Sequence, residues 1–299
     1  MKIAVLGSNG FLSNTIIGYY SNFPNIVVDV YGLEKPKRLF YNHFFPLNLV
    51  EVDLRGESIK DYDIIVYCIG AGIQFNLNED NDLIYKLNVS APVTICNALD
   101  TIGYKGIFIT FGSYFEIGAT ELRRPLTEKE LLFSEGRVPN DYTISKRMLS
   151  RYVESSKHSF TYWHFILPTI YGKGENPQRL IPYVINALSN NQKVTFTDGN
   201  QVRQYIHVDM IPAIIMNAYE NKLMSGIYNV EGNELLSVRE IVSLISDFMQ
   251  KELPQDVWGS LQRKDSSMRY LALDGSLLKS KINIVYNATI LSSLLKYNI

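Results

Sequence analysis

Short apolar segments alternate with longer amphipathic ones through the first half of the chain, and this alternation constrains the fold more than any other feature. The short segments are nearly continuous in hydrophobicity, rich in β-branched residues and bounded by breakers, which is typical of strands covered on both faces. They lie at residues 2–7, 25–31, 49–54, 63–69, 106–111 and 161–167. Helical patterns occur between them, at residues 11–21, 82–100 and 140–157. Such alternation predicts a parallel sheet with right-handed crossovers, which binds ligands at the carboxyl ends of its strands.

The pattern changes after about residue 168. Helical patterns and two short strand-like pieces follow, at residues 179–190, 193–197, 209–220, 226–230 and 237–251. The sequence therefore predicts an α/β fold, with a Rossmann-type doubly wound parallel sheet in residues 1–167 and a smaller C-terminal α/β lobe in residues 168–299. No linker separates the two lobes, so we expect them to pack together, and whether they interleave is left open.

Charge and residue usage exclude several classes of protein. The chain of 299 residues has a net charge of −1, so no basic excess points to nucleic acid. No apolar stretch approaches the ~20 residues of a membrane span, and the amino-terminal apolar run is too short for a signal peptide. The two cysteines and four histidines show no metal-binding spacing. We therefore expect a cytoplasmic protein without a metal, and without nucleic-acid or membrane partners.

A glycine-rich turn, VLGSNGFLSN, connects the first predicted strand to the first predicted helix. Gly7 permits a tight turn, and Gly10 lets backbone N–H groups approach a pyrophosphate at the helix N-terminus. The third small position of this motif is Ser13 rather than glycine, which weakens the match. The turn predicts a dinucleotide cofactor, NAD or NADP.

The residue that would bind the adenosine ribose is ambiguous. An acidic side chain is expected about 20 residues after the turn, at the end of the second strand. Asp29 lies near that offset, and Tyr31 is the alternative. Three cations follow and could instead hold a 2′-phosphate: Lys35, Lys37 and Arg38. The choice between NAD and NADP is therefore open.

Residues 141–147, DYTISKR, place a tyrosine four positions before a lysine. On a helix, Tyr142 and Lys146 would lie one turn apart on the same face. A lysine ammonium close to a phenol lowers the pKa of the phenol, as a proton-transferring tyrosine requires. Spacing alone does not decide, because Tyr31 and Lys35 repeat it.

The order of motifs favours the first pair. From Lys2 to about Asp274 the chain resembles the extended short-chain dehydrogenase/reductase family, in the group of epimerases, dehydratases and reductases that act on nucleotide sugars. The segments that carry the resemblance are GSNGFLS (7–13), VDLRG (52–56), CIGAGI (68–73), LNVSAPVTICNAL (87–99), TFGSYFEIG (110–118), NDYTISK (140–146), LPTIYGKGE (167–175) and DGNQVRQYIHVDM (198–210). The resemblance implies that residues 1–167 bind NAD or NADP and that residues 168–299 bind a nucleotide-diphosphate sugar.

The resemblance also implies roles for individual residues. Tyr142 would exchange a proton with a sugar oxygen, Ser113 would hydrogen-bond the same oxygen, and Lys146 would hold the nicotinamide ribose. The cofactor-binding residues would be Gly7, Asn9, Gly10, Phe11, Leu12, Asp29, Tyr31, Asp53, Leu54, Ile69, Gly70, Ala71, Asn88, Tyr142, Lys146 and Pro168. The substrate-binding residues would be Gly72, Ser113, Tyr114, Thr169, Arg179 and Arg203, the last of them at the diphosphate.

Departures from the family pattern narrow the implied reaction. Relatives that remove water carry an Asp-Glu pair directly after the catalytic Ser or Thr, and GDP-fucose synthase-like enzymes carry a cysteine near this point. This chain has Tyr114 and Phe115 there. The resemblance therefore implies reduction of a 4-keto group of a nucleotide-linked 6-deoxyhexose, with a 4-epimerase that retains NAD as the alternative. A non-catalytic dinucleotide-binding sensor is a third reading, which the presence of all three catalytic residues disfavours.

Two helical patterns, at residues 82–100 and 140–157, carry apolar residues on more than one face. The outward ones need a partner, and by resemblance these helices pair with their copies in a second subunit. We therefore expect a homodimer, with Val153 among the outward positions.

Overall fold

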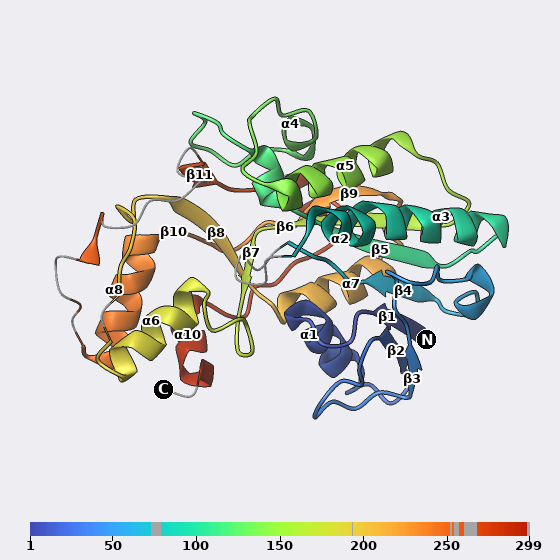
Figure 1. Ribbon diagram of the computed structural model, residues 1–299, viewed down its shortest axis with the longest axis horizontal. Coiled ribbons are helices and arrows are strands. Elements are labelled where there is room, and N and C mark those ends of the chain that lie inside the picture. Colours follow the sequence, from blue (N-terminus) through green and yellow to red (C-terminus); the bar gives the residue numbers. More distant parts are fainter. Residues whose placement is uncertain (73–78, 193, 252, 254–256, 260–267, 298–299) are drawn as a thin grey trace.

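The computed structural model describes residues 1–72, 79–192, 194–251, 253, 257–259 and 268–297. At its centre is a seven-stranded sheet with the order β3-β2-β1-β4-β5-β6-β9, in which every neighbouring pair is parallel (Figure 1). The strands are β1 (Lys2–Leu6), β2 (Val27–Gly32), β3 (His43–Pro46), β4 (Ile64–Tyr67), β5 (Ile107–Ser113), β6 (Thr161–Leu167) and β9 (Gly226–Asn229). The predicted doubly wound sheet is confirmed, and its strand order reverses between β1 and β4, where such sheets bind ligands.

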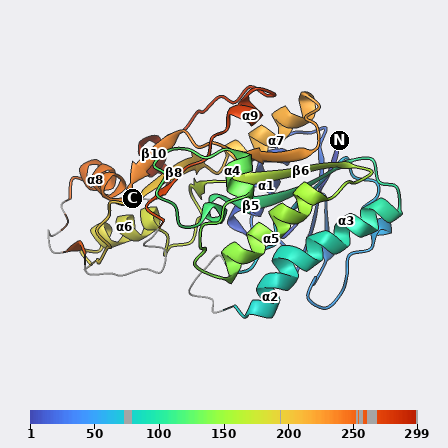
Figure 2. The same cartoon turned by 90° about the horizontal axis from the view of Figure 1, so that it is seen from above.

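Helices cover both faces of this sheet, because alternate residues of each strand point to opposite faces (Figures 1 and 2). Ala4 and Leu6 of β1 join the core on one face, whereas Ile3 and Val5 join the core on the other. The covering helices are α3 (Ala91–Thr101) and α5 (Asp141–Ser155) on the first face, and α1 (Phe11–Tyr20) and α7 (Met210–Glu220) on the second.

Helix α5 has a buried face and an exposed apolar face. Val153, which we expected to point outward, is only 8% exposed and packs into the core beneath α5. That expectation is wrong because Val153 lies one turn after Leu149, which is itself buried, and so shares its inward face. The exposed apolar residues of α5 are Ile144 and Met148, at 38% and 47% exposure.

A second, smaller sheet lies beside the first, at the left in Figure 1. Its central strand, β8, pairs with β10 in antiparallel fashion and with β7 and β11 in parallel. The strands are β7 (Thr169–Tyr171), β8 (Val202–His207), β10 (Glu234–Ser237) and β11 (Tyr270–Leu271). Helices α6 (Leu180–Ser189), α8 (Val238–Met249) and α10 (Ile290–Ser293) contribute to a separate core here. The chain enters this region after β6 and returns to the large sheet for α7 and β9, so the two lobes interleave.

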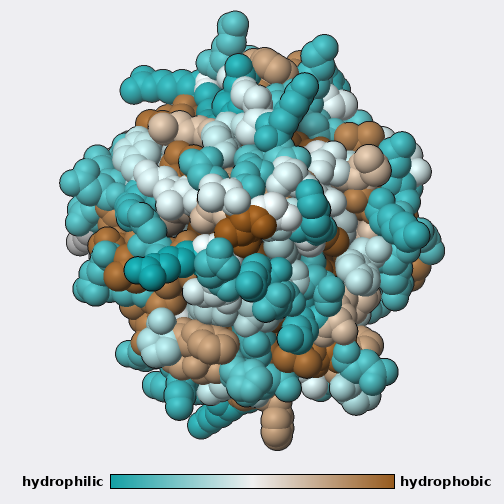
Figure 3. All heavy atoms as spheres, turned by 90° about the vertical axis from the view of Figure 1, so that its right-hand side faces the viewer, coloured by the Kyte–Doolittle hydropathy of each residue, from teal (hydrophilic) through white to brown (hydrophobic). Residues whose placement is uncertain are grey.

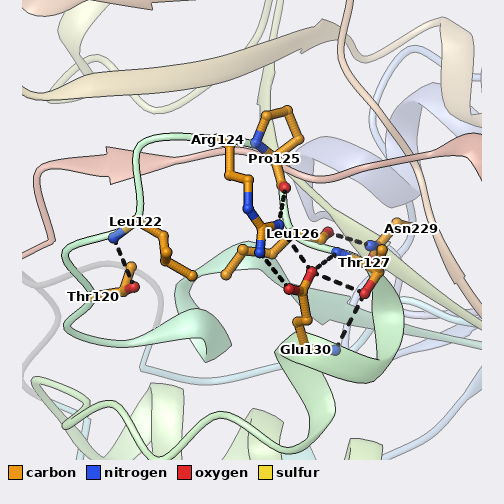
Figure 4. A network of polar contacts seen from close by, with 8 residues as sticks. All are labelled: Thr120, Leu122, Arg124, Pro125, Leu126, Thr127, Glu130 and Asn229. Atoms are coloured by element: carbon orange, nitrogen blue, oxygen red, sulfur yellow. Dashed lines mark hydrogen bonds and ion pairs between the residues drawn. The ribbon is translucent and has the colours of Figure 1, made fainter.

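A strap of backbone between β5 and α5 ties the lobes together. It includes α4 (Glu128–Leu132) and forms a parallel bridge from Leu126 to Leu273. Figure 4 shows the contacts that hold it: the Asn229 side chain donates to the Leu126 carbonyl at 2.9 Å, and Arg124 pairs with Glu130. The strap therefore anchors to β9 and to the segment after β11.

Two predicted strands are not strands. Residues 49–54 form a turn instead, in which the N–H of Val52 donates to the Asn48 carbonyl at 3.0 Å. Leu49 and Leu54 are buried there by packing. The edge strand next to β2 is β3, which lies earlier in the chain. In the second case, residues 194–197 bury Val194 and Phe196 without forming a strand, and residue 193 lies outside the described residues. Ile73 of the CIGAGI segment also lies outside the described residues.

The predicted helix at 82–100 is divided. It begins as α2 (Asn81–Tyr85), widens into a π-turn at Lys86–Ser90 and continues as α3. Pro92 has no N–H to donate to the carbonyl of Asn88, which accounts for a wide turn at this point. The wide turn carries Asn88, whose side chain is used in the site described below.

Within the described residues, no helix is both long and apolar enough to cross a bilayer. Figure 3 shows the face at the right of Figure 1, where hydrophilic side chains predominate and hydrophobic ones form separate spots. Single exposed apolar residues of this kind are normal on a folded protein.

Candidate active site

The glycine turn follows β1 and opens α1, as the sequence predicts. Gly7 has a φ of 112°, and a Cβ there would lie 3.2 Å from the Cys68 carbonyl carbon, so only glycine fits. Gly10 has an ordinary φ of −77°, and a Cβ there would meet only the Ser13 hydroxyl oxygen within 4 Å. The first turn of α1 carries no acidic residue. The turn therefore leaves open backbone N–H groups at a helix N-terminus, which fits a pyrophosphate.

Ser13 explains why the third glycine of the motif is not required. Its side chain is buried, and its hydroxyl donates to the Gly10 carbonyl at 3.0 Å. Phe11 and Leu12 are half-buried at the start of α1, and the Asn9 amide donates to the Glu34 carbonyl at 3.3 Å. These residues surround the open side of the turn.

Asp29 and Tyr31 are both engaged within the protein. The Asp29 carboxylate accepts from the Tyr62 hydroxyl at 2.7 Å and faces His43 at 2.9 Å. The Tyr31 hydroxyl donates to the Ser58 carbonyl at 3.1 Å. The strand ends instead at Gly32, where a Cβ would lie 2.2 Å from the Ser8 hydroxyl oxygen. The motif predicts an acid at this point and therefore does not select Gly32, although a glycine at the end of the second predicted strand is visible in the sequence.

Of the remaining predicted cofactor residues, four lie shortly after the carboxyl ends of β4 and β6, whereas Asp53 and Leu54 lie in the irregular segment after β3. Asp53 is exposed and pairs with Lys86 at 3.3 Å, whereas Leu54 is buried in the core. Ile69 and Gly70 are half-buried after β4, and Ala71 is buried. Pro168 is buried directly after β6.

Asn88 ties the loop after β4 to the helix that carries Tyr142. Its side-chain amide accepts from the Ala71 N–H and donates to the Ala71 carbonyl, both at 2.9 Å. It also donates to the Ser145 hydroxyl at 2.9 Å, and Ser145 in turn donates to the Tyr142 carbonyl at 2.7 Å. The loop after β4 and helix α5 are therefore held in one hydrogen-bond network.

Ser113, Tyr142 and Lys146 come together at the carboxyl end of β5. Ser113 is the last residue of that strand, and Tyr142 is the second residue of α5, which the Asn140 side chain caps at 3.0 Å from the Thr143 nitrogen. The Lys146 ammonium donates to the Phe111 carbonyl at 2.8 Å and lies 5.8 Å from the centre of the Tyr142 ring. The sequence-predicted pair therefore shares one face of the helix and meets the serine from another segment.

Burial dominates the ionisation of this pair. It raises the pKa of Tyr142 to about 12, although a hydrogen bond with Ser113 and the charge of Arg179 act in the opposite direction. Burial likewise lowers the pKa of Lys146 to about 8, against the opposing charge of Glu116. In the chain alone the pKa of Tyr142 is not lowered, because the loss of hydration outweighs the nearby charges. The expected lowering also involves the positive charge of a bound nicotinamide, so it stays a prediction.

The predicted substrate residues come from both lobes. The Tyr114 and Thr169 hydroxyls lie 2.5 Å apart, and Gly72 is so close to Tyr142 that a Cβ there would lie 3.0 Å from the tyrosine Cβ. Arg179 precedes α6 and pairs with the buried Glu175 at 3.3 Å, and Arg203 is largely buried on β8.

The charges of both arginines reach tyrosines of this region. The charge of Arg179 lowers the pKa of Tyr142, after burial and Glu116 have raised it. Both Arg203 and Arg179 also oppose the burial that raises the pKa of Tyr205, a neighbour of Tyr114. Arg179 therefore acts on Tyr142, and both cations act on Tyr205; guanidinium groups of this kind can bind a diphosphate.

Metal binding and thiolate chemistry lack suitable side chains among the described residues of this site. Among the described residues, no three histidine, cysteine or acidic side chains form a group that could hold a metal ion. Burial raises the pKa of Cys68 well above its ordinary value, which disfavours a thiolate at this site. Glu116, which the sequence gave no reason to select, is a fully buried acid three residues after Ser113.

Comparison with known proteins agrees with this geometry. The model of the NAD-dependent epimerase/dehydratase family matches residues 3–230. CDP-abequose synthase of Yersinia pseudotuberculosis is 23% identical over 287 residues, which cover 90% of this chain and 91% of that protein. dTDP-glucose 4,6-dehydratase of Streptomyces griseus is 29% identical over 117 residues, 38% of this chain and 34% of that protein.

Solved structures of low sequence identity share the fold. UDP-glucuronic acid 4-epimerase from Bacillus cereus, in complex with UDP-glucuronic acid and NAD, has a TM-score of 0.83 at 16% identity, covering 99% of this chain and 97% of that one. The dTDP-glucose 4,6-dehydratase DesIV from Streptomyces venezuelae, with NAD bound, has a TM-score of 0.80 at 19% identity, covering 99% and 95%.

Proposed function

Because the chain belongs to the NAD-dependent epimerase/dehydratase family, we propose that it is a nucleotide-sugar oxidoreductase that reduces a 4-keto group, with Tyr142 as the general acid. The observation that carries this proposal is the pairing of Tyr142 and Lys146 with Ser113 at the end of β5. The positions directly after Ser113 lack the acids that a dehydratase needs. The two residues after Ser113 are aromatic, and the next acid, Glu116, is turned into the core.

Each of the three residues has a defined task in this reaction. A bound nicotinamide supplies the hydride that reaches the carbonyl carbon. Tyr142 donates its proton to the carbonyl oxygen, and Ser113 hydrogen-bonds the same oxygen and fixes its direction. Lys146, held by the Phe111 carbonyl, places a positive charge beside the phenolate that remains.

The substrate is proposed from the two arginines and the relatives. Arg179 and Arg203 provide cations for a diphosphate, and guanidinium groups bind phosphate oxygens in pairs. The relative that matches along most of the chain is named for a cytidine diphosphate sugar, so CDP-linked 4-keto-6-deoxyhexoses are the first substrates to try. We propose NAD as the cofactor, since the solved neighbours contain it.

A 4-epimerase is the second candidate, supported by the shared fold with UDP-glucuronic acid 4-epimerase. The same three side chains would serve it, because epimerisation removes and returns a proton at one sugar oxygen. The two functions differ in whether the cofactor is exchanged at each turnover.

Incubation with a panel of nucleotide sugars tests these alternatives. One arm contains NADH or NADPH with CDP-, UDP- and dTDP-linked 4-keto-6-deoxyhexoses, and the other contains the unoxidised nucleotide sugars with no added cofactor. Consumption of reduced cofactor in the first arm supports a reductase, and interconversion in the second arm would replace it with an epimerase. If neither arm reacts while the protein still binds NAD, the sensor reading stands.

We also propose that the protein is a homodimer joined through α5. An apolar hollow of about 440 Å³ lies on the outer face of α5, lined by Val138, Ile144, Arg147, Met148 and Arg151. Two copies related by a two-fold axis would cover this hollow on both subunits.

Met148→Glu should therefore weaken the dimer, because it places a charge at the centre of the covered surface. Light scattering at micromolar concentration should show a shift toward monomer, with activity falling in parallel as α5 loses its support. Met224→Glu, a change of the same kind at a residue that is 77% exposed and lies before β9, serves as the control and should leave the mass unchanged. A wild-type protein that is fully active as a monomer would contradict the proposal.

A further inference from the structure

A carboxyl group lies directly behind the catalytic serine and takes no part in the mechanism above. Glu116 belongs to the short helical turn Tyr114–Ile117 and has no exposed surface. One of its oxygens accepts from the Ser113 backbone N–H at 2.7 Å, and the other accepts from the Ser150 hydroxyl at 2.6 Å. Gly112 makes room for it, because a Cβ there would lie 2.8 Å from a Glu116 oxygen.

The contacts of Glu116 continue through the core as a chain of polar side chains, which we call the Glu116–Tyr162 chain. The Ser150 hydroxyl lies 2.9 Å from the Nε2 of His164, and the His164 Nδ1 lies 2.7 Å from the Thr110 hydroxyl. The Thr110 hydroxyl lies 3.1 Å from the Tyr162 hydroxyl. All five side chains are buried, so each hydrogen bond has to be made within the chain.

The charge of Glu116 fixes the direction of every bond in this chain. When Glu116 is an anion, Ser150 donates to it and must accept from His164, which therefore carries its proton on Nε2. The Nδ1 of His164 then accepts from Thr110, which accepts from Tyr162. When Glu116 is protonated, it donates to Ser150, every bond reverses, and His164 carries its proton on Nδ1. In the protonated state the Tyr162 hydroxyl donates to the sulfur of Cys96, with which it also shares a hydrogen bond, so neither state leaves a buried donor without a partner.

The charges around Glu116 come mainly from α5. Lys146 and Arg147 stabilise its anion, and the Arg147 guanidinium also donates to the Glu116 backbone carbonyl at 2.6 Å. From β6 it is faced by His164, which burial keeps neutral by lowering its pKa to about 3. The acids of the neighbouring α4 are engaged elsewhere: Glu128 accepts from the Asn229 N–H and Glu130 pairs with Arg124.

Glu116 changes its charge in the neutral range and acts on the catalytic pair. Burial raises the pKa of Glu116 to about 7, against its hydrogen bonds and the two cations. Its anion in turn raises the pKa of Tyr142 and that of Lys146. At Tyr142 this adds to the larger effect of burial, whereas at Lys146 it opposes that effect.

We propose that Glu116 is a positioning residue, which fixes Ser113 through its backbone and sets the protonation of Tyr142 and Lys146 through its charge, and that His164 changes tautomer together with it. The effect on turnover rests on the proposed function, whereas the coupling between Glu116 and His164 does not.

The sign of the effect on turnover follows from the role of Tyr142. A general acid must keep its proton, and the anion of Glu116 raises the pKa of Tyr142 and so preserves the acid form as the pH rises. Removing that charge lowers the pKa of Tyr142. The activity for ketone reduction should then fail at a lower pH than in the wild type.

Glu116→Gln tests this, because glutamine can accept from the Ser113 N–H and donate to Ser150 in the direction of the protonated state. The basic limb of the pH profile of kcat should move down by about one pH unit, as expected for the loss of a nearby buried charge. Glu128→Gln, which neutralises another partly buried carboxylate away from the pair, should leave the profile in place. Coincident profiles for Glu116→Gln and wild type would overturn the proposal.

Nitrogen-15 NMR of the histidine side chains provides a test that needs no substrate. The chain has only four histidines, and His164→Asn assigns the signal. Between about pH 5 and about pH 9, wild-type His164 should pass from the Nδ1–H to the Nε2–H tautomer without becoming charged. In Glu116→Gln the Nδ1–H tautomer should persist throughout, and Ser150→Ala should uncouple the tautomer from pH.

The two measurements separate the possible failures. A wild-type His164 that keeps one tautomer over this range would refute the coupling, even if the variants do not fold. Absence of turnover with every nucleotide sugar, together with the tautomer change, would refute the proposed function and leave the coupling in place.

Discussion

Replacing Tyr142 with phenylalanine is expected to lower turnover by about two to four orders of magnitude. The change removes only the phenolic hydroxyl group, so the half-buried ring keeps its packing against Lys146. The hydroxyl hydrogen-bonds Ser113 rather than the glycine turn, and binding of the dinucleotide should therefore be nearly unchanged. Steady-state kinetics gives the first quantity, and calorimetric titration with NAD gives the second.

Tyr152→Phe is the matched control, since Tyr152 lies on the same helix and its ring packs against the hydrophobic core. Its turnover should stay within about threefold of the wild type. If Tyr142→Phe behaves like Tyr152→Phe, the assignment of Tyr142 as the proton donor is wrong. A matching loss of NAD affinity in Tyr142→Phe would instead indicate that the hydroxyl supports cofactor binding.

Replacing Gly10 with valine is expected to abolish measurable dinucleotide binding, with affinity lower by about two orders of magnitude or more. The backbone at Gly10 is compatible with a side chain, because its φ is −77° and only the Ser13 hydroxyl is near. The fold should therefore survive while the branched side chain fills the space above the helix N-terminus. Calorimetry measures the affinity, and circular dichroism shows whether the fold is kept.

Two other glycines define the limits of this prediction. Gly18→Ala, on the same helix, should bind NAD normally and be slightly more stable, by about 0.5–1 kcal/mol, because alanine is the better helix former. Gly7→Val should unfold the protein or fail to express, since its φ of 112° and its contact with the strand β4 end leave no place for a side chain. Normal NAD affinity in Gly10→Val would place the cofactor elsewhere.

The parts of the fold that sequence predicted well are those in which local and tertiary preferences agree. β1, the glycine turn and α1 follow directly from a continuous apolar run, two glycines and an amphipathic helix. The predictions failed where tertiary packing overrode the local pattern. In residues 49–54, Val50, Val52 and Leu54 alternate with acids as in a strand. In the structure Val50 and Val52 are exposed, whereas Leu49 and Leu54 fill the core from a turn, which the local pattern does not reveal.

The candidate site divides in the same way. Tyr142, Lys146 and Ser113 could be found because their spacing and order carry information, and the structure brings them together. The contacts of Asp29 with Tyr62 and His43 could not be predicted from the sequence, since these residues meet only in the folded chain. Glu116 is the clearest case: its importance lies in the partners it meets on α5 and β6, and a single glutamate in TFGSYFEIG does not reveal them.

The way the chain passes between its two sheets limits how the two lobes can move relative to each other. Pro168 is the single residue between β6 and β7, and its ring fixes one of the two backbone angles there. The chain crosses again before α7 and after β9, so a hinge motion would have to bend several short connections at once. Substrate exchange should therefore depend on movements of individual loops rather than on swinging of whole lobes. The same connectivity means that neither lobe could be separated, transplanted or exchanged as an independent module, because β9 completes a sheet that begins more than two hundred residues earlier in the chain.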